Sequence, residues 1–194
     1  MERKKFYLTA ARHGLIKFSV QQSFANRNRP GGRSFLVDSR GSGTNLTLRR
    51  MIVNALTEGL FTLPECDVIG GVANSGTQWA AILSYKLNMP FANILKEPRK
   101  SGLKRQVEGD INGKKVVLVD DWMNTGGSII TAVETVKAHG GIPVGLLLIA
   151  GEEAAQHNFE IPYAFAISTQ LLIEAAAELQ LIPAELNNEF ITIK

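Results

Sequence analysis

The sequence predicts an α/β fold with a central parallel sheet flanked by helices. Short runs of Val, Ile and Leu without polar alternation recur in the middle of the chain, which is typical of strands buried on both faces. These runs alternate with segments of helical periodicity, and such alternation favours a parallel sheet. Loops of special composition follow several of the runs, where a parallel sheet presents the carboxyl ends of its strands to a ligand.

The expected elements follow one another from residue 44 onward. Residues 44–61 are expected to form an amphipathic helix, because apolar residues such as Leu48 and Ile52 recur at helical spacing. Thr44 or Asn45 can cap its start. Further along, apolar runs predict strands and helical periodicity predicts helices, with the strands at 67–73, 91–96, 116–120 and 142–150 and the helices at 76–87 and 127–141.

The two ends of the chain are expected to form a smaller lobe. The first forty residues read as irregular, apart from a short strand at 34–38, because Gly, Arg, Asn and Ser are frequent there. The tail suggests a strand at 164–169, followed by a helix rich in Ala and Leu. The length of 194 residues suits one domain, with a core of about 42–155 and a lobe made of about 1–41 and 156–194.

Composition narrows the class of protein. A hydrophobic content of 45% and a charged content of 20% are ordinary for a soluble globular protein. The net charge of +3 is too small to indicate nucleic acid by itself, but it suits a small anionic ligand. The single cysteine, Cys66, cannot form an intramolecular disulfide, which fits a reducing cytoplasm. The chain starts with a charged segment, and no apolar run approaches the roughly 18 residues of a membrane span, so we expect neither a signal peptide nor a membrane partner.

The segment DDWMNTGGS, residues 120–128, carries the clearest chemistry. Its glycines allow backbone amides to point toward one place, and the helix that follows adds the positive end of its dipole, so the segment predicts a phosphate cradle. It lacks the lysine of a Walker A loop. Asp120 and Asp121 suit sugar hydroxyls, or hydroxyl-bound magnesium, beside that phosphate. We expect Gly127 to adopt a positive φ. The predicted cradle consists of Asn124, Thr125, Gly126, Gly127 and Ser128.

This segment resembles the phosphoribosyl diphosphate (PRPP) signature of the type I phosphoribosyltransferases. The resemblance implies a type I phosphoribosyltransferase-like fold, in which the smaller lobe is a hood made of the N- and C-terminal segments. It assigns the ribose hydroxyls to Asp120 and Asp121 and the 5′-phosphate to the cradle. A second loop matches the turn that wraps pyrophosphate in this family. The residues of that turn are Val72, Ala73, Asn74, Ser75 and Gly76.

A basic loop, residues 96–109, resembles the orotate phosphoribosyltransferases among these enzymes, and the resemblance covers roughly residues 14–150. It implies that Lys96, Arg99 and Lys100 join the two aspartates in catalysis. It further implies a homodimer in which this loop closes over the neighbouring subunit's pyrophosphate. Mg²⁺ is expected to bind mainly through PRPP, without a metal site made by the protein alone.

Several positions depart from the orotate pattern. Leu95 and Arg99 stand where the family has Arg and Lys, and Ser101 replaces a His. Ser75 replaces a Lys often found in the pyrophosphate turn. Gly151 stands where the orotate enzymes have an Arg that helps to hold the carboxylate of orotate. An unpaired carboxylate is costly to bury, so a different cation has to replace that Arg if orotate is the base.

Arginines of the smaller lobe can supply this cation. They are Arg27, Arg29 and Arg33, and we take Arg33 as the base-binding residue.

The sequence therefore predicts a PRPP-dependent phosphoribosyltransferase that resembles orotate phosphoribosyltransferase and releases pyrophosphate. Its departures leave two alternatives open: a non-catalytic regulator that binds PRPP, and a transferase that acts on a base other than orotate. Nucleic-acid binding is disfavoured, because aromatic residues are few and no recognition motif is present. A dinucleotide oxidoreductase is disfavoured too, because the turn at 70–76 lacks the G-x-G-x-x-G spacing.

Overall fold

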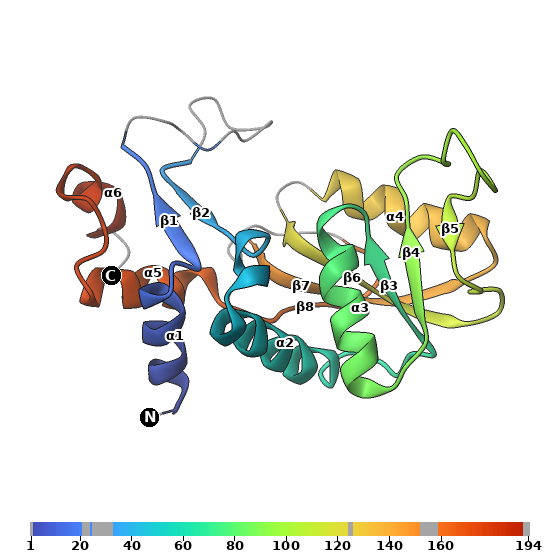
Figure 1. The fold of residues 1–194 in the computed structure, drawn as a ribbon, viewed down its shortest axis with the longest axis horizontal. Helices are drawn as coiled ribbons and strands as arrows, with labels where there is room; N and C mark the ends of the chain where they lie inside the picture. Colours follow the sequence, from blue (N-terminus) through green and yellow to red (C-terminus); the bar gives the residue numbers. More distant parts are fainter. Residues whose placement is uncertain (1, 21–23, 25–32, 124–125, 152–158, 192–194) are drawn as a thin grey trace. The chain divides into compact units, whose positions relative to one another are not determined.

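The structure is a computed structural model that describes residues 2–20, 24, 33–123, 126–151 and 159–191 (Figure 1). The chain divides into two compact units. The smaller unit comprises Met1–Met51 and Ser168–Lys194, and the larger unit comprises Ile52–Ile167. The sequence suggested boundaries near residues 41 and 155. The helix α2 (Leu46–Leu60) spans the first boundary of the structure.

The larger unit is built on a six-stranded sheet of order β5-β4-β3-β6-β7-β8. Every neighbouring pair is parallel except β4 and β5, which are antiparallel. The predicted α/β class with a mainly parallel sheet is thus confirmed, and β5 is an additional edge strand. The strands are β3 (Val68–Val72), β4 (Phe91–Ile94), β5 (Val107–Glu108), β6 (Lys115–Met123), β7 (Ile142–Gly151) and β8 (Tyr163–Phe165).

Two helices cover opposite faces of this sheet (Figure 1). α3 (Ser75–Leu87) connects β3 to β4 on one side of β3, whereas α4 (Gly127–Ala138) connects β6 to β7 in the opposite direction along the sheet. Because parallel crossovers are almost always right-handed, a change of direction moves the helix to the other face. The strand order therefore reverses between β3 and β6.

The core of the larger unit is apolar on both faces of the sheet. All five residues of β3 are buried, and so is the run from Val116 to Asp120 in β6. This explains why the strands read as uninterrupted apolar runs in the sequence. Val136 and Ile129 of α4 join the same core from one face.

β6 continues further than the sequence indicated. We expected a strand at 116–120 followed by a loop, but Trp122 and Met123 still pair with Ala150 and Gly151 of β7. The acid pair therefore lies within a strand, which fixes its backbone by hydrogen bonds on the β7 side. The cause is the length of the partner strand, which a local pattern does not reveal.

The smaller unit contains a helix that the sequence analysis missed. α1 (Glu2–Arg12) places buried Tyr7, Ala10 and Ala11 at helical spacing, and it packs against α5 (Thr169–Glu178). The hydroxyl of Tyr7 accepts a hydrogen bond of 3.0 Å from the backbone N–H of Ser168. The reading of the first forty residues as largely irregular was therefore wrong.

The other elements of the smaller unit are short. β1 and β2 form an antiparallel pair, and the carboxamide oxygen of Asn45 accepts hydrogen bonds of 3.0 and 3.1 Å from the N–H groups of Thr47 and Leu48, so Asn45 caps α2. In the described ranges, no helix is both long and apolar enough to cross a membrane. The short elements are β1 (Ile16–Phe18), β2 (Phe35–Val37), η1 (Gly41–Thr44), η2 (Ala184–Leu186) and α6 (Asn187–Ile191).

Candidate active site

The carboxyl ends of β3 and β6 lie side by side where the strand order reverses. Their register pairs Ile69 with Val117 and Gly71 with Val119, so the turn after β3 emerges next to the acid pair of β6. In open α/β sheets, ligands bind in the crevice at such a reversal point. Two of the three loops singled out in the sequence thus meet where this fold places a ligand.

The turn after β3 makes its closest approach at Gly76. A Cβ atom on Gly76 would lie 2.0 Å from the carbonyl oxygen of Val119 and 2.9 Å from the Cα of Asp120. Only a glycine allows this contact, because the neighbouring atoms belong to the backbone. The first turn of α3 therefore lies directly against the acid pair. The peptide bond between Ala73 and Asn74 in this turn is cis.

The turn is also well placed to receive an anion. α3 begins at Ser75, and the first N–H groups of a helix have no partner within the helix and carry the positive end of its dipole. Asn74 is exposed and Ser75 is half-buried, whereas Val72, Ala73 and Gly76 are buried.

Asp120 is a buried carboxyl group. Its exposed fraction is 8%, and its Oδ1 accepts a hydrogen bond of 2.8 Å from the N–H of Asp121. Burial, followed by the charge of Asp121, raises the pKa of Asp120 to about 7, and the positive charge of Lys96 opposes this rise. Asp121 is half-buried. The acid pair therefore offers oxygen atoms to a ligand, and Asp120 is the member whose ionised form burial disfavours.

The predicted cradle lies between β6 and α4. Asn124 and Thr125 fall outside the described residues. Gly126 is buried, has φ +80°, and accepts a hydrogen bond of 2.8 Å from the N–H of Ile130. Gly127 and Ser128 are exposed in the first turn of α4.

The glycine with the positive φ was misassigned in the sequence analysis. We expected it at Gly127, but Gly126 has this conformation, and a Cβ on Gly127 would meet no atom within 4 Å. A Cβ on Gly126 would lie 2.7 Å from the ring of Phe159. The reason is that Gly126 is the N-cap of α4, whereas Gly127 is already its first helical residue.

The basic loop connects β4 to β5 as an extended hairpin. Its base is closed by backbone hydrogen bonds from Leu95 to Gln106, at 2.9 Å, and from Arg99 to Arg105, at 3.2 Å. Lys96, Arg99 and Lys100 are all exposed. Lys96 acts on the pKa of Asp120, which places its charge near the acid pair. Arg99 instead forms an ion pair with Glu108 of β5.

The predicted base-binding positions belong to different parts of the molecule. Gly151 ends β7 in the larger unit, where a Cβ would lie 2.4 Å from the ring of Phe165. Arg33 belongs to the smaller unit, where its backbone exchanges hydrogen bonds of 2.7 and 3.0 Å with Phe24. Arg27 and Arg29 fall outside the described residues.

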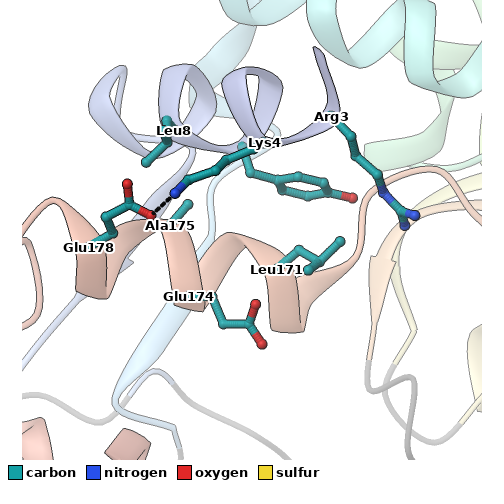
Figure 2. Close-up of a pocket in the computed structure, with 8 residues that line it drawn as sticks. Arg3, Lys4, Leu8, Leu171, Glu174, Ala175 and Glu178 are labelled. Carbon is teal, nitrogen blue, oxygen red and sulfur yellow. Dashed lines mark ion pairs between the residues drawn. The ribbon is translucent and has the colours of Figure 1, made fainter. Parts of the chain in front are cut away.

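A cavity of about 420 Å³ lies elsewhere, within the smaller unit (Figure 2). It is a groove between α1 and α5, crossed by an ion pair of 2.8 Å between Lys4 and Glu178. None of its lining residues is a predicted site residue. They are Arg3, Lys4, Tyr7, Leu8, Leu171, Glu174, Ala175 and Glu178.

The acid pair is chemically suited to a magnesium ion that arrives with its substrate. Carboxylate oxygens are preferred Mg²⁺ ligands, and a nearby cation would favour the ionised form of Asp120 that burial opposes. Among the described residues, no group of three or more His, Cys, Asp or Glu side chains gathers to hold a metal.

Comparison with known proteins identifies the family. A family model described as "Phosphoribosyl transferase domain" matches residues 47–170, which is more than half of the chain and includes all three loops. The chain belongs to the phosphoribosyltransferase family. The family and the enzyme class that the sequence predicted are thus confirmed.

Curated relatives agree with this assignment. The orotate phosphoribosyltransferase of Pyrobaculum islandicum is 32% identical over 141 residues, which cover 72% of this chain and 70% of the relative. Three other curated relatives with that name match over 48% to 56% of their own length, so the chain spans only about half of them.

Two solved structures share the fold. A structure of UMP synthase from Leishmania donovani has a TM-score of 0.80 at 16% identity and covers 99% of this chain and 42% of its own. A crystal structure of orotate phosphoribosyltransferase from Aeropyrum pernix has a TM-score of 0.71 at 21% identity. The match covers 89% of the present chain and 98% of the Aeropyrum pernix chain. At these identities, the likeness supports the fold alone.

Two polar residues near the site were missed by the sequence analysis. Asn93 of β4 and Thr77 of α3 form a hydrogen bond of 2.7 Å, and Asn93 also contacts Glu108 at 2.9 Å. An asparagine inside an apolar strand was the available signal, because a half-buried amide needs partners. The roles assigned to individual residues of the site stay predictions.

Proposed function

We propose that this phosphoribosyltransferase transfers ribose 5-phosphate from PRPP to a nucleobase and releases pyrophosphate. The observation that carries the proposal is the contact of Gly76 with Val119 and Asp120, because it joins the predicted pyrophosphate turn to the acid pair. A ligand that spans both needs a diphosphate next to vicinal hydroxyls. PRPP has this structure.

The chemistry is a displacement at the anomeric carbon of ribose. A lone pair of the base nitrogen forms the new C–N bond while the C–O bond to pyrophosphate breaks. Pyrophosphate leaves with the electron pair of the C–O bond, and the proton of the attacking N–H group passes to solvent. By analogy with glycoside cleavage, the transition state is oxocarbenium-like. The protein therefore needs to hold the ribose, stabilise the leaving pyrophosphate and exclude water, without forming a covalent bond.

Each loop has a part in this reaction. Asp120 and Asp121 accept hydrogen bonds from the ribose hydroxyls, and the turn at 72–76 offers backbone amides to pyrophosphate. The cradle at 124–128 holds the 5′-phosphate at the start of α4. Lys96 and Lys100 supply positive charge from the basic loop. When bound with PRPP, Mg²⁺ neutralises charge on the diphosphate, and the acid pair is the protein group best suited to contact it.

Orotate is the base that the relatives indicate, because the curated relatives reported above are named orotate phosphoribosyltransferases. The carboxylate of orotate then requires a cation, for which we propose Arg33. We also propose a homodimer in the cytoplasm, as expected from the resemblance and from the single cysteine.

One observation favours a second candidate, transfer to a base without a carboxylate. A Cβ on Gly151 would lie 2.4 Å from the ring of Phe165, so an aromatic ring packs beside the position where the orotate pattern has a cation. An aromatic ring suits the face of a neutral base better than a carboxylate.

A panel of bases tests these proposals. Pyrophosphate release from PRPP is measured with orotate, uracil and each purine base, beside PRPP binding by calorimetry. Turnover with orotate supports the main proposal, and Arg33→Ala should then raise KM for orotate. Turnover with a different base alone supports the second candidate. PRPP binding without any turnover indicates a regulator, and absence of PRPP binding refutes both transferase proposals.

The acid pair has its own test. Asp121→Asn should weaken PRPP binding by roughly tenfold or more, since a hydrogen bond to a charged group contributes about 1.5–3 kcal/mol. Circular dichroism checks that the fold is retained. Wild-type PRPP affinity in a folded variant contradicts the role assigned to the acid pair.

A further inference from the structure

A continuous chain of hydrogen bonds links α3 to the basic loop. The hydroxyl of Thr77 donates to the carboxamide oxygen of Asn93 at 2.7 Å. The amide nitrogen of Asn93 donates to Oε2 of Glu108 at 2.9 Å. Nη2 of Arg99 donates to the same oxygen at 3.1 Å, while its Nε contacts Oε1. β4, β5 and the basic loop thus meet at the carboxylate of Glu108, and α3 is linked to it through Asn93.

Glu108 is held in its ionised form by this chain. The hydrogen bonds from Arg99 and then from Asn93 lower the pKa of Glu108 to about 2. Its position is also fixed by the backbone, because the register of β4 and β5 places Glu108 opposite Asn93. A fixed carboxylate with two oxygens suits the planar guanidinium of Arg99, which donates to both.

The pair lies at the base of the loop rather than at its tip. Gln106 donates from its side chain to the carbonyl of Lys96 at 3.1 Å and to the hydroxyl of Thr135 at 3.2 Å, which fastens the base to α4. Residues 100–105 extend beyond Arg99 and are all exposed. The guanidinium of Arg99 is thus already paired with a nearby carboxylate, that of Glu108.

We infer that Glu108 is a positioning residue that holds Arg99 in reserve and releases it to pyrophosphate. The inference rests on the proposed function. Pyrophosphate carries several negative charges, so it competes with one half-buried carboxylate for the guanidinium. Asn93 and Thr77 keep Glu108 in place, which gives Arg99 a defined position to leave and to return to. The loop is then ordered without ligand and rearranges when pyrophosphate arrives.

A fixed structural bridge is the opposing explanation. In that case, the ion pair is present with and without ligand, and Arg99 never contacts pyrophosphate. The two explanations predict different changes in pyrophosphate binding when the charge of Glu108 is removed. Removing the charge of Glu108 frees Arg99 and strengthens pyrophosphate binding if the pair must break, whereas it weakens or does not change binding if the pair is a permanent bridge.

The test uses Glu108→Gln, which keeps the size and polarity of the side chain. Ion pairs close to the protein surface are weak, so we expect the Kd for magnesium pyrophosphate to fall by about 1.4- to fivefold in calorimetry. Arg99→Ala should weaken pyrophosphate binding, and adding Glu108→Gln to Arg99→Ala should bring no further change. Asp110→Asn is the matched control, because Asp110 pairs with Lys114 at 2.8 Å outside the chain of hydrogen bonds.

Trypsin reports the state of the loop. The loop should be cleaved faster in ligand-free Glu108→Gln than in the ligand-free wild type, and pyrophosphate should protect both. Unchanged or weaker pyrophosphate binding in Glu108→Gln overturns the inference, as does wild-type binding in Arg99→Ala. Binding of ribose 5-phosphate distinguishes a failure of the proposed function from a failure of the role inferred for Glu108. If the wild type binds neither ribose 5-phosphate nor pyrophosphate, the proposed function itself fails, and if it binds both while the variants behave like the wild type, only the role of Glu108 fails.

Discussion

Replacing Asp120 with Asn should make the protein more stable at neutral pH while weakening PRPP binding. Asp120 is 8% exposed, and burial raises its pKa from 3.8 to about 7. The unfolded chain therefore loses this proton at a lower pH than the folded chain. The wild type becomes less stable as the pH rises from about 4 to about 7, whereas Asn has no charge to bury.

The pKa difference sets the size of the effect. A change from 3.8 to about 7 corresponds to about 4 kcal/mol, at about 1.4 kcal/mol per pKa unit. The charge of Asp121 contributes to this rise, so part of this energy belongs to the pair and not to burial alone. We expect the Asn variant to gain about 1–3 kcal/mol in the free energy of unfolding above pH 7. The hydrogen bond of 2.8 Å from the N–H of Asp121 is retained, since the Asn oxygen can accept it.

Urea unfolding at about pH 5 and about pH 8 measures this effect. The advantage of Asp120→Asn should be larger at the higher pH. Asp110→Asn is the control, because Asp110 is exposed and the hydrogen bond from Lys114 lowers its pKa, so its replacement should bring no gain at either pH. A stability gain that does not depend on pH, or a loss at about pH 8, would refute the reasoning.

The remaining predictions concern glycines of the site. Gly126→Ala should weaken binding of ribose 5-phosphate, because φ is +80° and a Cβ would lie 2.7 Å from the ring of Phe159. Gly127→Ala should leave it near the wild-type value, since a Cβ there meets nothing within 4 Å, and equal effects of the two changes in calorimetry would contradict the assignment. Gly76→Ala should lower the melting temperature and PRPP affinity together, because a Cβ would lie 2.0 Å from the carbonyl of Val119. A thermal scan in which the variant melts like the wild type would show that this contact is not tight.

The sequence revealed the parts of the sheet that are set by local composition. The runs at 68–72 and 142–151 were recognised because strands buried on both faces need uninterrupted apolar residues. β5 has only two residues, too few for any pattern, and it exists because the chain returns beside β4 after the basic loop. The extension of β6 through Met123 depends likewise on a partner strand that is distant in sequence.

The candidate site likewise has features that local composition predicts and features that only the tertiary structure determines. Its loops were found because glycines, acids and basic residues cluster in short segments. The contact of Gly76 with β6, the positive φ at Gly126 and the chain from Thr77 to Glu108 depend on strand order and register, which the sequence does not display. Local composition therefore indicated the candidate segments, and the tertiary structure determined which of their residues are in contact.

The two-residue strand β5 also protects the edge of the sheet. β4 would otherwise present unpaired backbone groups along an apolar strand, and such an edge invites pairing with another chain. The segment that carries the basic loop thus shields β4 from aggregation as well. A deletion designed to remove the loop's positive charges would uncover this edge, and inactive aggregates would then be mistaken for a catalytic defect. Point substitutions at the tip of the loop, which leave β5 in place, avoid this confusion.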